Sequence, residues 1–195
     1  MGLTKQAKTL SKHQQFALLS YLETTRYAKR NKVIFLLSLR AGLRAKEIAS
    51  ITWGMITDAE GEIANAIKLQ NKASKGNSGG VVWMNEDLKH ALVEYRKLRK
   101  FTHANDKIIK TERENETSAQ AIVNMFKSWY KKLGFEGCSS HSGRRTFITN
   151  AARKISTVGG SIRDVQALAR HSSLQMTQRY IEFDVEAQKK VVQLI

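Results

Sequence analysis

Residues 63–84, IANAIKLQNKASKGNSGGVVWM, hold two short apolar runs on either side of a cluster of Ser, Gly and Asn. Short runs rich in Ile and Val that are bounded by turn-forming residues are typical of strands. The cluster between them, residues 74–80, indicates a hairpin, although it is longer than a two-residue turn. We therefore expect strands at residues 63–69 and 81–84 that pair in a small antiparallel sheet.

Helical patterns surround this sheet. Ser11 and Gln14 have the spacing of a capping box, and Gly42 is placed to end a later helix. The apolar positions expected to be buried in the first helix are Phe16, Leu18, Leu19 and Leu22, and those in the helix after Asn85 are Leu88, Ala91, Leu92, Tyr95 and Leu98. Other helices are expected at residues 27–40, 44–51, 119–133, after 141, from 161 to 169, and at 174–181 and 185–195. The predicted fold class is therefore mainly α with a small antiparallel β-sheet (α+β).

The balance of charge points to the partner. The chain has 33 Lys and Arg residues against 17 Asp and Glu, a formal net charge of +16. A surplus of this size attracts a polyanion, and nucleic acid is the commonest polyanion in a cell. Nucleic acid is therefore the expected partner, with an acidic lipid surface as the alternative, and a place in the cytoplasm, at the nucleoid, fits best.

Several other classes of protein are not expected. No stretch approaches the length of about 18 apolar residues that a membrane-spanning helix needs, and the N-terminus lacks the apolar core of a secretory signal. The single cysteine, Cys138, cannot form an internal disulfide or build a multi-cysteine zinc site. We expect neither a metal nor any other cofactor.

Three short motifs carry side chains suited to chemistry on a phosphodiester. Arg44 follows the helix break at Gly42, and His141 with Arg144 would share one face of a helical turn. The third motif begins at His171 and supplies the candidate nucleophile. Each residue also has a structural alternative: Arg44 could pair with Glu47, three residues on, along a solvated helix face, and His141 could be an exposed loop residue.

The third motif is His171-Ser-Ser, with Tyr180 nine residues after the histidine. A tyrosine hydroxyl can act as a nucleophile and form a covalent intermediate. The alternative for Tyr180 is a core aromatic whose hydroxyl finds a hydrogen-bond partner.

The ordered set of motifs resembles the tyrosine recombinases, or phage integrase family. That family has an Arg after Gly-Leu, a His-x-x-Arg, and a Leu-Gly-His-Ser-Ser block with a Tyr nine residues downstream. The corresponding residues here are Arg44, His141, Arg144, His171 and Tyr180, and the resemblance runs from about residue 15 to 185. It implies a DNA integrase that breaks and rejoins strands through a 3′-phosphotyrosyl bond to Tyr180.

The resemblance also gives roles to the other side chains. Arg44 and Arg144 would hold the non-bridging phosphate oxygens, because a planar guanidinium binds them bidentately. His171 would donate a further hydrogen bond to these oxygens, and His141 would accept or orient the Tyr180 proton. The family has a Lys in the turn between its second and third strands. Lys75 occupies that place and would protonate the departing 5′ oxygen, with Lys72 as the alternative.

Two departures from the family pattern lie near His171. Ala169-Arg170 stands where Leu-Gly commonly precedes the histidine, and Arg170 adds a bulky cation there. The 27 residues from Arg144 to His171 are a few more than usual, and residues 156–160 are the expected excess. Neither departure removes a catalytic group.

We expect residues 1–195 to form one catalytic domain, at about 11–184, with a C-terminal tail at 185–195. The family's N-terminal core-binding domain is not expected, so the chain is either a fragment or a minimal single-domain recombinase. The resemblance implies a homotetramer on paired DNA sites, assembled through the tail; docking of the tail on its own domain is the alternative.

Two other functions remain open from the sequence. A type IB topoisomerase uses the same Arg, Lys, His and Tyr chemistry, and a DNA-binding regulator could use the fold without catalysis. The Gly-Leu-Arg and His-Ser-Ser flanks favour the recombinase.

Overall fold

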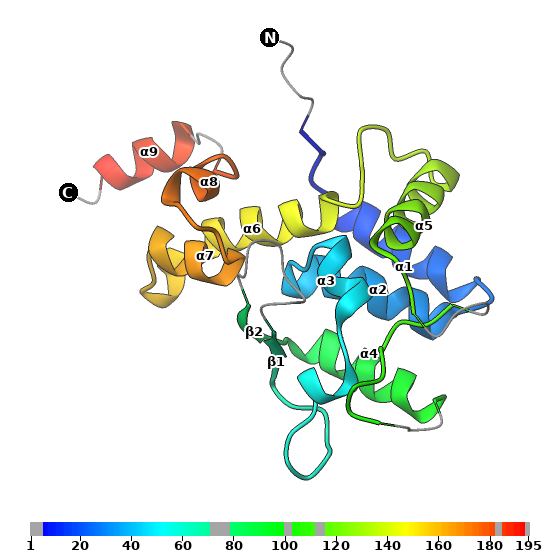
Figure 1. Cartoon of the computed structure of the whole chain (residues 1–195). Coiled ribbons are helices and arrows are strands. Elements are labelled where there is room, and N and C mark those ends of the chain that lie inside the picture. The colour runs from blue at the N-terminus through cyan, green and yellow to red at the C-terminus, as the bar shows by residue number, and fades with distance from the viewer. Residues whose placement is uncertain (1–5, 71–78, 100–102, 112–115, 182–184, 194–195) are drawn as a thin grey trace. The chain divides into compact units, whose positions relative to one another are not determined.

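The structure is a computed structural model of the whole chain, and it describes residues 6–70, 79–99, 103–111, 116–181 and 185–193 (Figure 1). The chain divides into two compact units, Met1–Phe147 and Ile148–Ile195. The boundary falls inside one helix, and each unit is described here by itself.

The described part of the first unit is mainly helical and holds two strands that pair with each other. Its elements are α1 (Lys12–Glu23), α2 (Ala28–Ala41), α3 (Ala45–Ser50), the 3-10 helix η1 (Trp53–Met55), β1 (Ala66–Leu69), β2 (Gly80–Trp83), α4 (Glu86–Lys97), α5 (Ala119–Lys132) and the start of α6 (Ser142–Lys154). The second unit holds the rest of α6, the 3-10 helix η4 (Ile155–Val158), α7 (Ile162–Ala169), α8 (Leu174–Gln178) and α9 (Val185–Val192). The predicted α+β class is confirmed.

Local capping explains where the helices begin and end. The Ser11 hydroxyl accepts a hydrogen bond from the Gln14 amide at 3.1 Å, which confirms the capping box of α1. Asn85 and Ser118 cap α4 and α5 in the same way. Gly42 ends α2 with a φ of 62°, a left-handed conformation that favours glycine.

The sheet consists of β1 and β2, which pair antiparallel with Ala66 opposite Trp83 and Leu69 opposite Gly80. The expected pairing is confirmed, but β1 is shorter than predicted. Ile63 instead forms an isolated bridge with Thr57, because the chain turns at residues 58–62 before the strand begins. Residues 71–78, which connect the two strands, lie outside the described residues.

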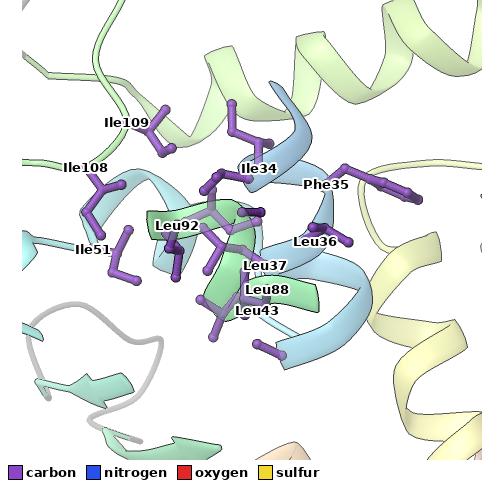
Figure 2. Close-up of a cluster of buried hydrophobic side chains, with 14 of the residues drawn as sticks. Ile34, Phe35, Leu36, Leu37, Leu43, Ile51, Leu88, Leu92, Ile108 and Ile109 are labelled. Atoms are coloured by element: carbon purple, nitrogen blue, oxygen red, sulfur yellow. The ribbon is translucent and has the colours of Figure 1, made fainter. Parts of the chain in front are cut away.

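Figure 2 shows the centre of the first unit's core, where α2 and α4 pack together. Leu37, Leu88 and Leu92 meet between these helices and are fully buried. Ile108 and Ile109 close the cluster from a segment that has no regular structure, and both are 0% exposed. Burial of a side chain of this size stabilises the fold by about 1.5–3 kcal/mol, so these two residues anchor their segment to the core.

Two residues predicted to be buried are exposed. Phe16 is 71% exposed because Leu18 and Leu22, one turn apart, define the buried face of α1, and Phe16 projects from the other face. Leu98 is 68% exposed because α4 ends at Lys97 and Leu98 is only its C-cap. The other predicted positions of α4 are buried, as are Leu18 and Leu22 of α1.

The second unit has a small core of its own. Ile148, Val165 and Ala169 are buried, and α7 packs against α8. In α9, Val191 and Val192 are 55% and 66% exposed. Within the described residues, no helix is long and apolar enough to cross a membrane.

Candidate active site

Arg44 is held by a buried carboxylate. It is the N-cap residue of α3, and its Nη1 lies 3.0 Å from Glu47 Oε1. Its backbone amide donates to Glu47 Oε2 at 2.7 Å. The Glu47 side chain is 0% exposed, whereas that of Arg44 keeps 22% exposure. Arg44 therefore does pair with Glu47, but the carboxylate is buried rather than on a solvated helix face. This contact orients the guanidinium.

Arg144 lies near the start of α6 and is tied to the end of α2. It is 3% exposed, and its Nη1 donates to the Gly42 carbonyl at 2.5 Å. Gly42 stands two positions before Arg44, so both arginines are anchored at the same chain reversal. A guanidinium has five N–H donors in a planar arrangement that suits an anion such as phosphate.

Two glycines allow α2 and α6 to approach closely enough for this contact. A Cβ at Gly143 would lie within 3 Å of the Ser38 side chain, and a Cβ at Gly42 would lie 2.6 Å from the Phe147 ring. Ser38 and Gly42 are one turn apart in α2, as are Gly143 and Phe147 in α6. The helices therefore meet along a narrow seam that places Arg144 beside Gly42.

His141 occupies the position before α6, where its carbonyl accepts a hydrogen bond from the Arg145 amide at 2.8 Å. The pKa of His141 is lowered from its ordinary value, first because neighbouring protein atoms desolvate the ring and then because Arg144 and Arg44 are positively charged. The residue still has exposed surface. A neutral, accessible imidazole beside two arginines is suited to accept a proton.

His171 begins the candidate site of the second unit. It is 7% exposed, and its Nδ1 lies 3.0 Å from the Thr177 hydroxyl, which is itself buried. The Gln166 side chain donates to the His171 carbonyl at 3.1 Å, so the backbone is held as well. When the Thr177 hydroxyl donates to Nδ1, the proton of the neutral ring lies on Nε2, which can then donate to a phosphate.

Tyr180 lies directly against this histidine. The two ring centroids are 5.3 Å apart with an interplanar angle of 28°. Thr149 of α6 donates to the Tyr180 carbonyl at 3.2 Å, and the Tyr180 amide bonds the Thr177 carbonyl. The predicted pair is therefore brought together, and Tyr180 is half-buried.

The remaining predicted residue, Lys75, lies outside the described residues, as does its alternative Lys72. The first unit thus brings together Arg44, His141 and Arg144, and the second brings together His171 and Tyr180. Each of these two sets is held by hydrogen bonds to residues of its own unit. Among the side chains that the structure describes, no three of the His, Cys, Asp or Glu type are grouped to hold a metal ion.

Two positioning residues were not predicted from the sequence: Thr177 as the partner of His171, and Gly143 as the glycine that admits α6. The spacing of Arg44 and Glu47 was visible as a possible ion pair, but not its burial. No local pattern predicts the role of Thr177, because nothing in the sequence indicates that its hydroxyl lies against the ring of His171, six residues earlier.

Comparison with known proteins identifies the family. The model of the phage integrase family matches residues 8–186, and the chain belongs to this family. The chain is 27% identical over 192 residues to "Tyrosine recombinase XerA" of Thermococcus onnurineus, and the match covers 94% of this chain and 61% of that relative. It is 27% identical over 162 residues to "Tyrosine recombinase XerC" of Caldanaerobacter subterraneus, covering 81% and 42%. The chain therefore spans about three fifths, or less, of the length of these relatives.

Solved structures share the fold. A crystal structure of XerA recombinase aligns with a TM-score of 0.73 at 22% identity and covers 100% of this chain and 66% of the other. The Tn1549 transposon integrase, solved in complex with a circular intermediate DNA, aligns with a TM-score of 0.75 at 20% identity, covering 98% and 67%. Both support the expected catalytic-domain fold of a tyrosine recombinase.

Proposed function

We propose that this chain carries the catalytic domain of a site-specific DNA recombinase, at about residues 11–184, that cleaves and rejoins strands through Tyr180. The observation that carries the proposal is the stacked pair of Tyr180 and His171 in a chain that also holds Arg44, His141 and Arg144 in the family's order. The relatives and structures similar to this chain are named as recombinases or integrases, which supports recombination over a topoisomerase or a regulator.

In the proposed reaction, the Tyr180 oxygen attacks the phosphorus and the bond from phosphorus to the 5′ oxygen breaks. The phenol proton passes to His141, and Lys75 gives a proton to the departing 5′ oxygen, which leaves as a 5′ hydroxyl. The 3′-phosphotyrosyl ester keeps the energy of the phosphodiester, so rejoining by another 5′ hydroxyl needs no ATP.

The cations stabilise charge that develops on the phosphate. Arg44 and Arg144 bind the non-bridging oxygens, and His171 donates to them through Nε2. Removal of one such donor typically lowers the rate by about 10²–10³. Glu47 keeps Arg44 in place, because a buried carboxylate that bonds both its guanidinium and its amide restricts the side chain to one direction.

The proposed partner is double-stranded DNA, to which the net charge of +16 attracts the chain. The Tn1549 integrase was solved with DNA, and the XerH recombinase was solved bound to its difH substrate, which supports this partner. We further propose that four copies assemble on paired sites through the tail at 185–195, and that the protein works at the nucleoid in the cytoplasm. The exposed Val191 and Val192 support an intermolecular role for the tail.

A nicked duplex that traps the covalent intermediate tests the proposal. A library of such duplexes with varied sequence is incubated with the protein, and adducts that survive denaturant are isolated and sequenced. We expect an adduct whose attachment maps to the peptide containing Tyr180, also in excess chelator. Tyr180→Phe should lose the adduct and keep DNA binding, because it removes only a hydroxyl.

The arginines provide a second arm of the same experiment. Arg44→Ala and Arg144→Ala should each slow adduct formation by about 10²–10³, whereas DNA affinity should fall far less. An adduct that forms at another residue in Tyr180→Phe, or cleavage that depends fully on magnesium, would show that the mechanism is wrong.

A further inference from the structure

The segment before α1 lies against the start of α6 and the loop that leads into that helix (Figure 1). We call this segment, residues 6–10, the N-terminal strap. The Lys8 amide donates to the Gly137 carbonyl at 3.0 Å, and a Cβ at Gly137 would lie 2.9 Å from the Lys8 side chain. The Arg145 side chain donates to Gln6 Oε1. The strap therefore contacts the chain both before α6 and within its first turn.

The buried link between the strap and α6 is the hydroxyl of Thr146. The Leu10 amide donates to Thr146 Oγ1 at 2.8 Å, and Thr146 donates to the Ser142 carbonyl at 2.7 Å. Leu10 is 4% exposed and Thr146 is 2% exposed, and a buried amide without a partner destabilises the arrangement that buries it. Thr146 therefore holds the strap against α6. The Gln15 side chain holds it against α1, because it donates to the Leu10 carbonyl at 3.0 Å.

The turn at the start of α6 fixes the backbone of His141. The His141 amide donates to Ser139 Oγ at 3.2 Å, and the Ser139 amide donates to Ser142 Oγ at 3.0 Å. The Ser142 amide donates to the Ser139 carbonyl at 2.8 Å. Ser142 is fully buried, and its carbonyl is the one that Thr146 bonds. A continuous series of contacts therefore runs from the strap through Thr146 to the backbone of His141.

The backbone of His141 determines how close its ring lies to two arginines. Desolvation by neighbouring protein atoms lowers the pKa of His141, and the positive charges of Arg144 and Arg44 lower that pKa further. Because the residue is otherwise exposed, a ring that moves away from these neighbours gains water and loses repulsion. Both changes raise the pKa toward its ordinary value. The pKa of His141 therefore reports the position of its ring.

We infer that Thr146 is a positioning residue for His141, and that through Thr146 the N-terminal strap sets the place of the candidate base. Three contacts carry the inference: the buried bond from the strap to the Thr146 hydroxyl, the bond from that hydroxyl to the residue directly after His141, and the serine contacts that join this residue to the His141 amide. Displacement of the strap then changes the position of the base from outside the site. The consequence for the cleavage rate rests on the proposed function, whereas the consequence for the ring does not.

NMR titration of the full chain without DNA tests the position of the ring. The Cε1–H signal of His141, identified by its loss in His141→Gln, is followed in the unmodified chain and in Thr146→Val. Valine keeps the volume of threonine and removes the hydroxyl, so the Leu10 amide and the Ser142 carbonyl both lose this partner. We expect the pKa of His141 to rise toward its ordinary value. Thr146→Ser keeps the hydroxyl and should return the pKa to that of the unmodified chain.

Thr117→Val is the matched control. Thr117 is 5% exposed and its hydroxyl donates to the Ile109 carbonyl at 2.9 Å, so the change also removes a buried, hydrogen-bonded hydroxyl from the first unit. It should leave the pKa of His141 unchanged, which separates the effect of Thr146 from general destabilisation. Gln15→Ala releases the strap from α1 without changing the core, so it should shift the pKa in the same direction as Thr146→Val but by less.

Single-turnover cleavage of a nicked duplex measures the second consequence. Thr146→Val should slow cleavage by about tenfold, less than the factor of about 10²–10⁴ that a general base contributes, with DNA affinity retained. In the His141→Gln background the same change should cause no further loss, because the residue through which Thr146 acts is gone. An undiminished loss in that background would show that Thr146 acts by another route, such as Arg144, and would overturn the inference.

Two results of the titration would also overturn it: a pKa of His141 that is the same in Thr146→Val and Gln15→Ala as in the unmodified chain, or an equal shift in Thr117→Val. The titration contains no DNA and involves no cleavage, so the two proposals fail separately. An unmoved pKa in a chain that cleaves DNA rejects the role of Thr146 alone. A raised pKa in a chain that forms no covalent adduct keeps that role and rejects the proposed function.

Discussion

The Nδ1 atom of His171 lies 3.0 Å from the Thr177 hydroxyl, both residues are buried, and the His171 ring stacks on the ring of Tyr180. A hydroxyl at this position can donate to Nδ1 or accept from it, and the proposed mechanism needs it to donate. With Thr177 as the donor, Nε2 of the neutral imidazole carries its proton and can donate to a phosphate oxygen. The tautomer needed by the proposed mechanism therefore depends on a residue outside the family motif as it was recognised in the sequence.

Thr177→Val tests this dependence. The change removes the hydroxyl at nearly constant volume and leaves Nδ1 without this donor, so the imidazole is free to take the other tautomer. We expect cleavage to slow by about tenfold or more while DNA affinity is retained, because a charge-assisted hydrogen bond in the transition state contributes about 1.5–3 kcal/mol. Single-turnover rates on a nicked duplex measure the effect. Thr177→Ser should recover most of the rate, and a Val variant as fast as the Ser variant would refute the role of the hydroxyl.

Glu47→Ala should act through Arg44. The change removes two hydrogen bonds to Arg44, one to the guanidinium and one to the amide at the start of α3. We expect a loss of about 1–3 kcal/mol in the free energy of unfolding and a slower cleavage rate. A double-mutant cycle with Arg44→Ala gives the test. If Glu47 only stabilises the fold, its effect on the rate will be the same with and without the arginine; if it orients Arg44, the effect disappears in Arg44→Ala.

Gly143→Ala should disturb the seam between α2 and α6. The new Cβ would collide with the Ser38 side chain at a separation under 3 Å, so the helices must move apart. We expect destabilisation of about 1–3 kcal/mol, measured by denaturant unfolding, and a loss of the contact between Arg144 and Gly42. Ser38→Gly removes the atoms that collide and should restore part of the stability of the alanine variant. Additive losses in the double variant would show that this seam is not tightly packed.

The lowered pKa of His141 predicts a dependence on pH. Because the folded state binds the proton less readily than the unfolded state, the free energy of unfolding falls as pH decreases from about 6.5 through the folded pKa. The neutral base is lost over the same range, so the cleavage rate should fall with acidity too. His141→Gln should flatten both profiles. A profile that stays equally steep in this variant assigns the titration to another group.

The tail gives a separate prediction for the proposed assembly. Removal of residues 186–195 takes away α9, a helix of 8 residues that is too short to be stable alone in water. If the tail joins subunits, the truncated chain remains folded and binds single sites, but it no longer forms a tetramer on paired sites. Analytical ultracentrifugation with one-site and two-site DNA distinguishes these states. Outright unfolding would show instead that the tail belongs to the core of its own chain.

Local structure followed from the sequence because its causes lie within one or two turns of the chain. The capping box at Ser11, the left-handed Gly42 and the hairpin pattern around β1 and β2 each depend on neighbouring residues alone. The order and spacing of Arg44, His141, Arg144, His171 and Tyr180 were readable for the same reason, and they led to the family. Lys75 stays a prediction, since it lies outside the described residues.

Tertiary structure decided which of these groups are buried and what holds them. Ser38 and Gly143 stand more than one hundred positions apart, and only the packing of α2 on α6 brings them into contact. The burial of Glu47, the return of the Thr177 hydroxyl to His171, and the contact of the N-terminal strap with α6 arise in the same way. Hydrophobic period and charge are properties of a segment, whereas desolvation and hydrogen-bond geometry depend on the segments that pack against it, and no local pattern encodes those neighbours.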